Sequence, residues 1–394
     1  MESTIVPSLI EELLTPQEER LEVIKKSGKL RIGLPKEVCF DEKSIALTPD
    51  AIQVLVKYGY EICVETGAGQ GAFFSDLEYS EAGALIVDKK TAFEQDLVLK
   101  INPPTEKEIE LMKPNSYLIS ALQVNLRNEE YFKKLSEKKI NAIAFEFIGD
   151  ENKEHSLVKL IGEISGRASV LYASELLVLS KGLMLGGITG VRPTEIVVLG
   201  AGIVGEYAVK TAIGLGAMVK VFDNSLPKLR KLQDVVGRPI STSMIDPKEL
   251  TKSLRRADVL IGALSRVNSS PVITEEMVCL MKKGSVIIDL AVGSGKCVET
   301  TEITNDKNPY TEKYGVLHCG LPNLTSKISR TTSRAISNFF LGYFLENHMN
   351  EGIEHLLMKN EIRESFYVYK GRFTKKMICD KYNLKFNDIN LLLF

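Results

Sequence analysis

The segment "TEIVVLGAGIVGEYAVKTAIGLG", residues 194–216, indicates how the centre of this chain folds. Its apolar run "IVVL" is typical of a strand buried on both faces, and the residues that follow have the spacing of a helix. Gly200, Gly202 and Gly205 lie at the junction. Glycines at these positions permit a tight turn, let a pyrophosphate approach the backbone and let the helix pack closely on the strand. The helix N-terminus also presents N–H groups and its positive dipole end to phosphate.

An acidic residue completes this pattern. Asp223 closes the next strand, "VKVFD", 23 residues after Gly200. A carboxylate at this position can accept hydrogen bonds from both ribose hydroxyls of a dinucleotide, and it disfavours a 2′-phosphate. The segment therefore predicts a binding site for NAD and not for NADP. The alternative for the glycines is a turn with a structural role only.

A second glycine motif, in "ETGAGQGAFFSD", has similar spacing. Gly67, Gly69 and Ala72 follow the pattern, and Asp88 lies 21 residues after Gly67. Two phenylalanines and a helix-capping residue, Ser75, come next, so no helix begins within the motif to direct N–H groups at a phosphate. We interpret this motif as a structural loop.

Strand and helix patterns alternate along both halves of the chain. After a helical lead-in at residues 15–26, strands are expected at "KLRIGLP", "YEICVE", "ALIV", "DLVLKI", "SYLIS" and "NAIAFE", and later at "MVKVFD", "ADVLIGAL", "SVIIDLA" and "YGVLHCG". Long helices are expected near residues 157–181 and 332–349. Such alternation favours parallel sheets. The predicted fold class is α/β: two doubly wound, Rossmann-like domains joined by long helices, with the tail after about residue 350 returning to the first domain.

The composition is that of a globular protein large enough for two cores. The chain has 394 residues, of which 44% are hydrophobic and 26% charged, and its net charge is −1. This balance gives no electrostatic reason to expect nucleic acid or an anionic membrane as a partner. The apolar tract "ASVLYASELLVLSKGLMLGG" is interrupted by Glu175 and Lys181, which argues against a membrane span.

The cysteines and the N-terminus bear on location. Six cysteines are scattered, with no CxxC motif and no metal-like pairing with the four histidines. This spacing predicts reduced thiols and no metal site. The N-terminus "MESTIVPSLIEELL" lacks the basic region of a secretory signal. We therefore expect a cytoplasmic protein.

From about Lys29 onward the chain resembles a known family. The likeness rests on "RIGLPKE…ALTP", "VETGAGQGA", "LVLKINPP", "EISGR", "GGITGVRPTEIVVLGAGIVGEYA", "FDNSLPKLR" and "MKKGSVIIDLA". These motifs resemble alanine dehydrogenase and the cofactor-binding subunit of proton-translocating transhydrogenase. The tail "YVYKGRFTKKMICDKYNL" is similar to the dehydrogenase and not to the transhydrogenase subunit. "KGLMLGGITGVRPTE" and "SALQVNLRNEEYFKKL" resemble a subgroup of alanine dehydrogenases with a longer N-terminus.

The resemblance implies a discontinuous substrate domain around an NAD domain. Residues 1–156 would form the first part of the substrate domain, residues 157–335 the NAD domain, and residues 336–394 a linker helix and the return to the substrate domain. In the family, small residues after the strand "SVIID" let the nicotinamide ring approach the backbone. The residues then expected to contact the cofactor are Gly200, Ala201, Gly202, Ile203, Val204, Gly205, Asp223, Lys228, Leu264, Ser265, Leu290, Ala291, Val292, Gly293 and Leu321.

The substrate side departs from the family pattern. The family lysine that holds the substrate carboxylate matches Lys100 in "LVLKINPP". The family arginine is replaced by Ser44, the histidine relay by Gln123, and the acid/base aspartate by Gly293. Lys100 and Gln123 remain as candidate catalytic residues. Losing an arginine from a desolvated carboxylate pair costs about 2–5 kcal/mol, and losing a general acid/base costs about 10²–10⁴ in rate.

Other candidates have a structural alternative. Lys296 could supply the missing cation or be a solvated loop lysine, and His318 could relay protons or be packed in its strand. Cys319 has no neighbour in sequence that would activate a thiolate. Three histidines are expected on the surface: His155, His348 and His355.

Four functions are compatible with these features. The first is an NAD-dependent alanine dehydrogenase that oxidises L-alanine to pyruvate and ammonia, or catalyses the reverse reaction. The second is a relative that acts on another amino acid or an imine, and the third is an NAD-binding pseudoenzyme. A transhydrogenase component is disfavoured by the tail and by the lack of a membrane segment. The expected partner is a small 2-amino or 2-oxo acid, and the expected assembly a homo-oligomer, with the hexamer of alanine dehydrogenases as one candidate.

Overall fold

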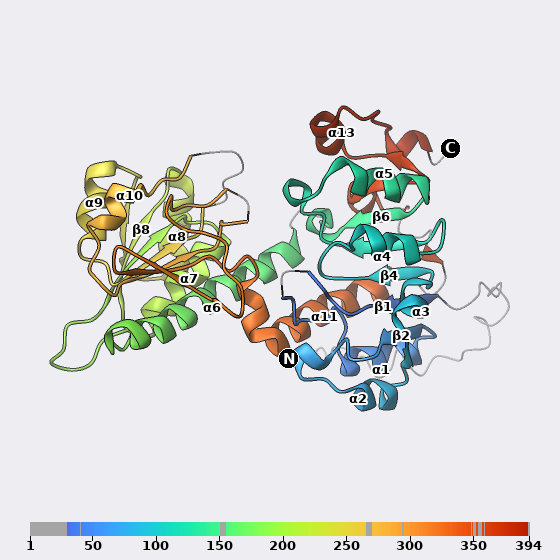
Figure 1. Ribbon diagram of the computed structural model, residues 1–394, viewed down its shortest axis with the longest axis horizontal. Helices are drawn as coiled ribbons and strands as arrows, with labels where there is room; N and C mark the ends of the chain where they lie inside the picture. The colour runs from blue at the N-terminus through green and yellow to red at the C-terminus, as the bar shows by residue number, and fades with distance from the viewer. Residues whose placement is uncertain are drawn as a thin grey trace, which may run out of the picture.

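Figure 1 shows two α/β bodies joined by long helices. The computed structural model describes residues 30–39, 41–149, 155–264, 270–293, 295–347, 349, 352, 353, 357 and 359–392. The helical lead-in expected at residues 15–26 lies outside these ranges, as do Ser265, His348 and His355.

The first body is built on an eight-stranded sheet. Its order is β15-β14-β6-β5-β4-β1-β2-β3. The strands are β1 (Arg31–Leu34), β2 (Glu61–Glu65), β3 (Leu85–Val87), β4 (Leu97–Leu99), β5 (Tyr117–Ser120), β6 (Asn141–Ala144), β14 (Phe366–Tyr369) and β15 (Arg372–Phe373). β1 to β6 run parallel, whereas β14 is antiparallel to β6 and β15 to β14. The tail of the chain therefore extends the sheet that the first residues begin.

Short helices connect the strands of the first body. They are α1 (Pro49–Lys57), α2 (Asp76–Glu81), α3 (Lys89–Phe93), α4 (Glu106–Leu111) and α5 (Glu129–Glu137). Ser75 and Glu78 form a reciprocal capping box at the start of α2. "TPDAIQVLVKYG", residues 48–59, is typical of a helix with Thr48 as its cap, and α1 begins there, but the Thr48 side chain makes no cap hydrogen bond and its hydroxyl lies 3.1 Å from that of Ser337. A contact between distant segments has replaced the local cap.

The second body holds a seven-stranded sheet in the order β12-β13-β11-β10-β7-β8-β9. The strands are β7 (Glu195–Leu199), β8 (Met218–Phe222), β9 (Ser241–Ser243), β10 (Val259–Gly262), β11 (Val286–Asp289), β12 (Thr311–Lys313) and β13 (Val316–Cys319). Only β12 is antiparallel among the described strands of this sheet. Its helices are α7 (Ile203–Gly214), α8 (Leu226–Val236), α9 (Pro247–Leu254) and α10 (Glu275–Cys279). Omitting β12, the order is that of a doubly wound dinucleotide-binding sheet.

Two long helices link the bodies: α6 (Ser156–Lys181) and α11 (Ser329–Glu346). α6 packs on α7 through small residues, because a Cβ at Gly166 would lie 2.3 Å from the carbonyl oxygen of Val204. The tail adds α12 (Asn360–Arg363) and α13 (Lys376–Tyr382). Figure 1 places α13 beside the first body. The predicted fold class of two doubly wound α/β domains joined by long helices is confirmed.

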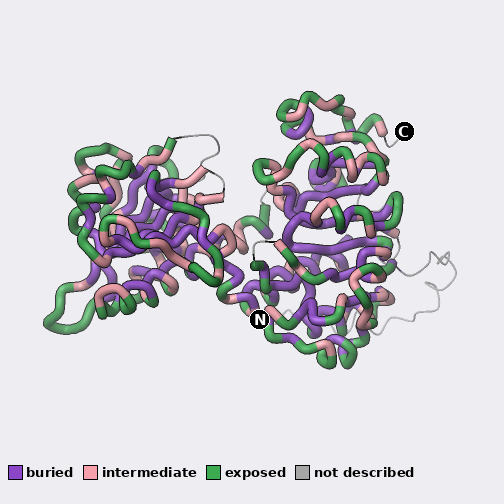
Figure 2. The backbone as a smooth tube through the Cα atoms, viewed as in Figure 1, coloured by how far each residue is buried: buried purple, intermediate pink, exposed green. Residues whose placement is uncertain are grey.

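The cores follow the sheets. Figure 2 shows buried residues along the inner strands of both bodies and exposed residues on the outer loops and helices. The strands β10, β11 and β13 are buried at every position, as near-continuous apolar runs predict for parallel sheets. Among the described residues, no helix combines the length and the apolar character needed to cross a bilayer.

Candidate functional site

The glycine loop lies where the strand order of the second sheet reverses. β7 is flanked by β8 on one side and β10 on the other, so the connections after β7 and β10 diverge to opposite faces. Ligands of doubly wound sheets bind in the crevice at this point, outside the carboxyl ends of the strands. The loop between β7 and α7 carries Gly200, Gly202 and Gly205 at that edge.

Each glycine of the loop meets a different constraint. Gly200 has φ +106°, and a Cβ there would lie 2.6 Å from the carbonyl oxygen of Ala263. A Cβ on Gly205 would lie 1.9 Å from the carbonyl oxygen of Gly200, so this glycine serves the packing of the loop on its helix. A Cβ on Gly202 would meet no described protein atom within 4 Å. The fold therefore requires the first and third glycines, whereas the second borders space that a ligand can use.

Asp223 is held against the same loop. Its Oδ2 accepts a hydrogen bond from the Ala201 N–H at 2.7 Å, and its Oδ1 accepts from the Ser225 N–H at 2.8 Å. The side chain is buried at the end of β8. Each carboxylate oxygen has a further lone pair, so the group can also accept from ribose hydroxyls. Lys228 is exposed in the first turn of α8. This geometry fits the ribose and pyrophosphate of NAD.

The loop after β11 forms the neighbouring rim. Asp289, at the end of that strand, is fully buried and accepts from the N–H groups of Ala291 at 3.0 Å, Cys297 at 2.8 Å and Val298 at 3.0 Å. Burial raises the pKa of its carboxyl, and these three hydrogen bonds oppose the rise. Asp289 thus closes a turn that exposes Leu290 toward the space between the bodies. Its structural role could be predicted from its place after a buried strand.

A cavity of about 430 Å³ lies between the two bodies. Four of the predicted site residues line it together: Gln123 from the first body, and Val204, Leu290 and Gly293 from the second. Its other lining residues are Glu42, Ile101, Asn102, Ala121, Val124, Asn125, Leu126, Phe145, Glu146, Val158, Ile161, Ser165, Pro322, Asn323, Leu324, Thr325, Thr332 and Ile336. None of these described lining residues is a lysine, arginine or histidine.

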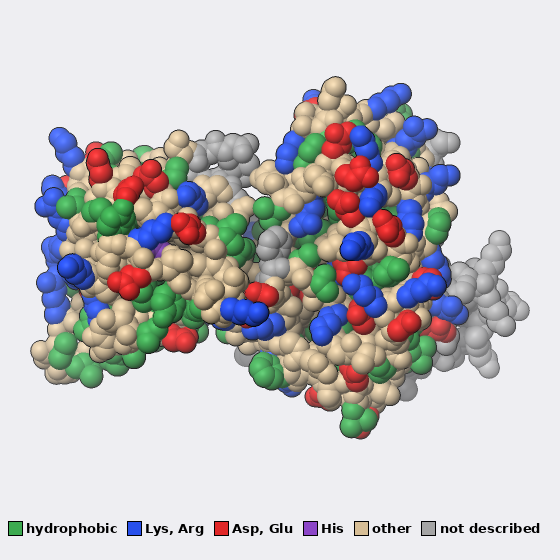
Figure 3. All heavy atoms as spheres, viewed as in Figure 1, with side chains coloured by type: hydrophobic (Ala, Val, Ile, Leu, Met, Phe, Trp, Pro, Cys, Tyr) green, Lys and Arg blue, Asp and Glu red, His purple; other side chains and the backbone are tan. Residues whose placement is uncertain are grey.

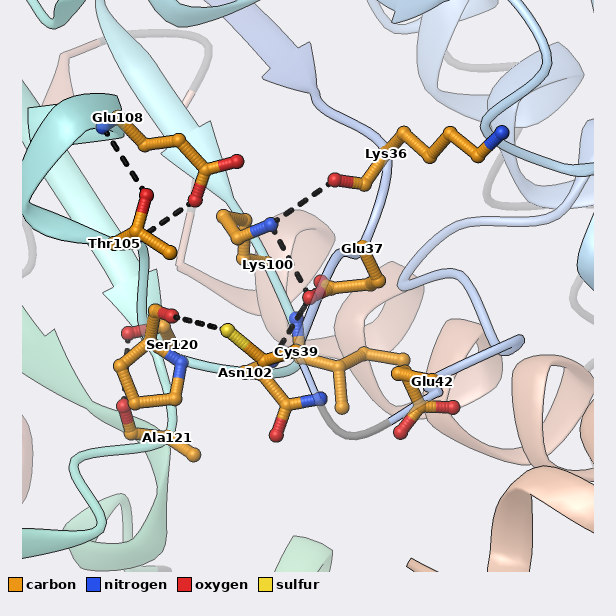
Figure 4. Close-up of polar contacts among 12 residues, drawn as sticks. Lys36, Glu37, Cys39, Glu42, Lys100, Asn102, Thr105, Glu108, Ser120 and Ala121 are labelled. Atoms are coloured by element: carbon orange, nitrogen blue, oxygen red, sulfur yellow. Dashed lines mark hydrogen bonds and ion pairs between the residues drawn. The ribbon is translucent and has the colours of Figure 1, made fainter. Parts of the chain in front are cut away.

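Lys100 is not among the residues that line this cavity. It follows β4, and its side chain is 1% exposed. Its ammonium nitrogen lies 3.2 Å from Oε2 of Glu37 and donates to the carbonyl oxygen of Lys36 at 3.3 Å. It also lies 5.9 Å from the centre of the Phe93 ring. Figure 4 shows the ammonium directed at Lys36 and Glu37, with the Asn102 side chain pointing the other way.

Glu37, which the sequence reasoning missed, organises the loop after β4. Besides the Lys100 ammonium, its carboxylate accepts from the N–H of Ile101 at 2.7 Å and from that of Asn102 at 3.4 Å. Burial raises the pKa of the Glu37 carboxyl, and the Lys100 ammonium opposes that rise. β1 and β4 adjoin at the reversal of strand order in the first sheet, so this ion pair lies at the edge where doubly wound sheets bind ligands. The sequence signal for Glu37 is that it closes "RIGLPKE", one of the motifs shared with the family.

Gln123 is held in a polar network at the cavity wall. It has φ +46°, a left-handed conformation, at the start of the short 3-10 helix Val124–Leu126. Glu146 accepts from the N–H of Leu122 at 2.8 Å and from that of Gln123 at 3.3 Å, and burial raises the pKa of its carboxyl. The Gln123 side chain donates to Oδ1 of Asn102 at 2.9 Å and accepts from Arg127 at 3.4 Å. Sequence reasoning identified Gln123 alone in this network.

The replaced family positions lie in different surroundings. Ser44 is buried, and its hydroxyl has no hydrogen-bond partner among the described residues. Gly293 lines the cavity, where the described atom nearest to an added Cβ would be Cβ of Pro322, at 3.9 Å. Lys296 donates from its ammonium to the carbonyl oxygens of Glu299 at 2.5 Å and Thr301 at 3.4 Å. This arrangement ties the Lys296 side chain to its own loop.

The remaining candidates have structural partners. His318 is buried in β13, with Nε2 2.8 Å from the Thr300 hydroxyl and Nδ1 2.9 Å from the carbonyl oxygen of Val316. Burial lowers the pKa of His318, which favours the neutral ring. Burial also raises the pKa of the Cys319 thiol to about 11, so the thiolate is disfavoured. Neither residue lines the cavity.

The second glycine motif forms a packed loop. A Cβ on Gly69 would lie 2.4 Å from the Tyr79 ring, and one on Gly71 would lie 2.7 Å from the carbonyl oxygen of Lys43. The Gly67 N–H donates to Asp76 at 2.9 Å, so a side chain of the protein already occupies that donor. Asp88 caps α3 by accepting from the Thr91 N–H. These contacts agree with the interpretation as a structural loop.

Comparison with known proteins identifies the relatives of this chain. The family described as "Alanine dehydrogenase/PNT, N-terminal domain" matches residues 33–165, and "Alanine dehydrogenase/PNT, C-terminal domain" matches residues 169–376. An alanine dehydrogenase of Methanococcus maripaludis is 32% identical over 364 residues, which cover 90% of this chain and 97% of that protein. Alanine dehydrogenase 2 of Staphylococcus aureus is 32% identical over 369 residues, which cover 91% of this chain and 98% of that protein.

Solved structures agree. An L-alanine dehydrogenase superposes with a TM-score of 0.83 at 32% identity, over 90% of this chain and 99% of that one. A transhydrogenase from Sinorhizobium meliloti has a TM-score of 0.75 at 23% identity, over 88% of this chain and 99% of that one, and shows the shared fold. The resemblance noted in the sequence is thus confirmed, and the chain belongs to the alanine dehydrogenase/PNT family.

Proposed function

We propose that this chain is an NAD-dependent alanine dehydrogenase-type enzyme that interconverts L-alanine with pyruvate and ammonia. The observation that carries the proposal is the cavity between the bodies, in which Val204 and Leu290 of the cofactor-binding edge face Gln123 of the first body. NAD, when bound, supplies the chemistry of hydride transfer to and from the amino-acid Cα. The relatives that cover nine-tenths of the chain carry the name alanine dehydrogenase.

The proposed cofactor site uses the edge of the second sheet. Gly202 leaves space for the pyrophosphate, the first turn of α7 directs N–H groups at it, and Asp223 accepts from the ribose. The other residues assigned to the cofactor are Gly200, Ala201, Ile203, Val204, Gly205, Lys228, Leu264, Ser265, Leu290, Ala291, Val292, Gly293 and Leu321, of which Ser265 lies outside the described residues.

On the substrate side, we assign Gln123 to the cavity wall and Lys100 to the loop that supports that wall. Gln123 lines the cavity, whereas the Lys100 ammonium pairs with Glu37. An amide cannot act as a general acid or base near neutral pH, so Gln123 orients and does not exchange protons. The cavity is also wide at Gly293. A second candidate substrate is therefore a 2-amino acid larger than alanine.

The domain roles are part of the proposal. Residues 1–156 and 336–394 would form the substrate domain with its linker helix, and residues 157–335 the NAD domain. The pairing of β14 with β6 supports this division, because it joins the tail to the first sheet. The cysteine spacing that predicts reduced thiols supports a cytoplasmic location.

A homo-oligomer is also proposed. Large apolar side chains are exposed along the second half of α6 and the turn after it: Leu171, Val178, Leu179, Met184, Ile188 and Val191. Figure 3 shows hydrophobic side chains gathered along the lower edge of the second body, where Figure 1 places α6. Contiguous exposed apolar surface of this kind marks protein–protein contacts. Light scattering during size-exclusion chromatography should give a mass well above the 43.8 kDa of one chain, with a hexamer as the expected state.

The test of the function is a substrate panel. Purified protein is incubated with NADH, ammonia and a series of 2-oxo acids from pyruvate upward, and NADH oxidation is followed by absorbance. Turnover with pyruvate supports the alanine reaction, and preference for a longer acid identifies the second candidate. NADH binding without turnover of any acid would show a pseudoenzyme and refute both.

A further inference from the structure

Asn102 lines the central cavity and carries a buried side-chain donor without a partner. Asn102 is 4% exposed, and its Nδ2 has no hydrogen-bond partner among the residues that the structure describes. Among the described residues that line the cavity, it alone has a buried side-chain polar atom left unpartnered. A buried amide N–H without a partner is costly, so such groups in folded proteins commonly await a ligand or water. Asn102 is one of the residues that line the cavity, so a ligand bound there is the partner that lies nearest to hand.

The direction of this amide follows from a chain of hydrogen bonds. A guanidinium has donors only, so the atom of Gln123 that faces Arg127 Nη2 at 3.4 Å must be Oε1. The Gln123 Nε2 then faces Asn102 at 2.9 Å, and the atom that receives its hydrogen bond must be Oδ1. Asn102 Nδ2 is left to point away from the network. The Arg127 charge thereby determines that the unpartnered atom of Asn102 is a donor and not an acceptor.

The backbone around Asn102 is held independently. The Glu37 carboxylate accepts from the N–H groups of Ile101 and Asn102, and it pairs with the buried Lys100 ammonium. In Figure 4 the Lys100 side chain points toward Glu37 and the Asn102 side chain points the opposite way. The ion pair therefore fixes the loop that directs Asn102 at the cavity.

The charge of the cavity leaves a role for such a donor. Its described lining includes two carboxylates, Glu42 and Glu146, and no cationic side chain. Glu42 already accepts from the Ser44 N–H and from the Asn323 amide, and Glu146 from two N–H groups. A ligand with an anionic or carbonyl oxygen needs donors here. The nearest cation in the network, Arg127, acts through Gln123.

We propose that Asn102 is a substrate-binding residue: its Nδ2 donates to a carboxylate or carbonyl oxygen of a 2-oxo acid. Arg127 and Gln123 are positioning residues that orient and polarise this amide. The inference rests on the proposed function for the class of ligand, and it adds a donor in place of the arginine that Ser44 replaces. The neutral amide of Asn102 would then bind the substrate oxygen that the arginine binds in the family pattern.

The experiment measures pyruvate binding apart from catalysis. Protein loaded with NADH, without ammonia, is titrated with pyruvate while NADH fluorescence is followed. Asn102→Leu keeps the volume and removes the donor, and Asn102→Asp keeps the acceptor for Gln123 and adds an anion. Because a hydrogen bond to a charged oxygen is lost, both variants should weaken pyruvate binding by roughly 10- to 100-fold. The NADH dissociation constant should stay within about twofold, since the contacts assigned to NADH lie in the second body.

A double-mutant cycle tests the relay. Arg127→Met should weaken pyruvate binding by roughly three- to tenfold on its own and by less than about twofold in the Asn102→Leu background, because the same interaction is already lost. Lys134→Met is the matched control. Lys134 and Arg127 line one groove on the surface of the first body, but Lys134 pairs with Glu106 and Glu110 and is not part of the hydrogen-bond chain to Asn102. It should leave pyruvate affinity unchanged. Thermal unfolding of each variant checks that it is folded.

The outcomes separate the two proposals. Unchanged pyruvate affinity in folded Asn102→Leu would overturn the role of Asn102, even if the wild type turns over 2-oxo acids. Loss of affinity in both Asn102 variants, with a wild type that binds pyruvate but turns over no acid, would support Asn102 and refute the dehydrogenase function. A wild type that binds NADH but no 2-oxo acid would overturn both. Additive effects in the cycle would refute the relay through Arg127.

Discussion

Replacing Lys100 by methionine should strongly destabilise the first body, because Glu37 would keep a buried charge without its partner. The Lys100 side chain is 1% exposed and that of Glu37 is 5% exposed, and their charged atoms lie 3.2 Å apart. Breaking one side of such a buried pair costs about 3–5 kcal/mol. For a domain of this size, that loss corresponds to a fall in Tm of about 6–20 °C. Differential scanning fluorimetry measures the change.

A matched lysine and the partner residue provide controls. Lys89 also pairs with a glutamate, Glu108, and also lies over the Phe93 ring, at 5.8 Å, but the Lys89 side chain is 42% exposed. Glu108 is 1% exposed, and without Lys89 it still accepts from the Thr105 N–H at 2.9 Å and keeps the favourable charge of Lys100. Lys89→Met should therefore cost far less than Lys100→Met. The double variant Lys100→Met, Glu37→Gln should regain part of the lost stability, since no unpaired charge remains buried.

The pH dependence gives a second check. Burial raises the pKa of Glu37, whereas the Lys100 ammonium lowers it. Removing the ammonium should therefore raise the Glu37 pKa further. An acid whose pKa is raised in the folded state binds its proton more tightly there than in the unfolded state. The free energy of unfolding therefore falls as pH rises from the pKa of the unfolded state to the pKa of the folded state. Lys100→Met should thus be least destabilised near pH 5 and most at pH 8. A fall in Tm no larger than that of Lys89→Met, or one independent of pH, would refute the buried ion pair.

Three further predictions concern the cofactor and the replaced positions. Asp223 should make the dissociation constant of NADH at least tenfold lower than that of NADPH in fluorescence titrations, and Asp223→Ser should reduce this ratio; equal constants in the wild type would contradict the assignment. Gly202→Val should abolish NADH binding while leaving Tm nearly unchanged, because no described protein atom lies within 4 Å of its Cβ position. Gly205→Val should instead lower Tm, because its Cβ would lie 1.9 Å from the carbonyl oxygen of Gly200. Intact NADH affinity in Gly202→Val would refute the pyrophosphate site. The double variant Ser44→Arg, Gly293→Asp should show at least tenfold more alanine activity than either single variant, because each single change buries an unpaired charge; if the wild type is efficient on another substrate and the double variant loses that activity, the replacements are adaptations.

Most of the fold could be predicted from local patterns. Apolar runs and the glycine loop identified β1 to β6, β7, β8, β10, β11, β13 and the place of the cofactor edge, because these signals depend on residues a few positions apart. The edge strands β9, β12 and β15 and the tail strand β14 were not predicted. The capping residue Ser75 predicted that no helix opens within the second glycine motif; the structure has no α-helix there, but it does have the three-residue 3-10 helix Gln70–Ala72. The pattern at Thr48 and Pro49 indicates where α1 begins, but it does not indicate that the Thr48 hydroxyl contacts Ser337, a residue 289 positions away.

The substrate side could be predicted only in part. The motif "LVLKINPP" singled out Lys100, and the structure gives the more direct contact with the cavity to Asn102, two residues later. Successive residues after a strand point in different directions, and the Glu37 carboxylate, 64 positions from Ile101, holds the loop in which Ile101 and Asn102, but not Lys100, line the cavity. No pattern in one sequence reports that pairing. Arg127 and Glu146 were missed for the same reason, since they act through contacts at the cavity wall.

By itself, the sequence determined the two alternating α/β halves, the dinucleotide loop around Gly202 and the identity of the family, because each rests on spacing within one segment. Only the tertiary structure decided which side chains meet between the bodies. Three features result from the packing of segments brought together by sheet pairing and by α6 and α11: the close approach of Gln123 to Asn102, the burial of Lys100 against Glu37, and the burial of the Ser44 hydroxyl with no hydrogen-bond partner among the described residues. Such contacts depend on the closure of long loops and on burial, which a local pattern does not contain.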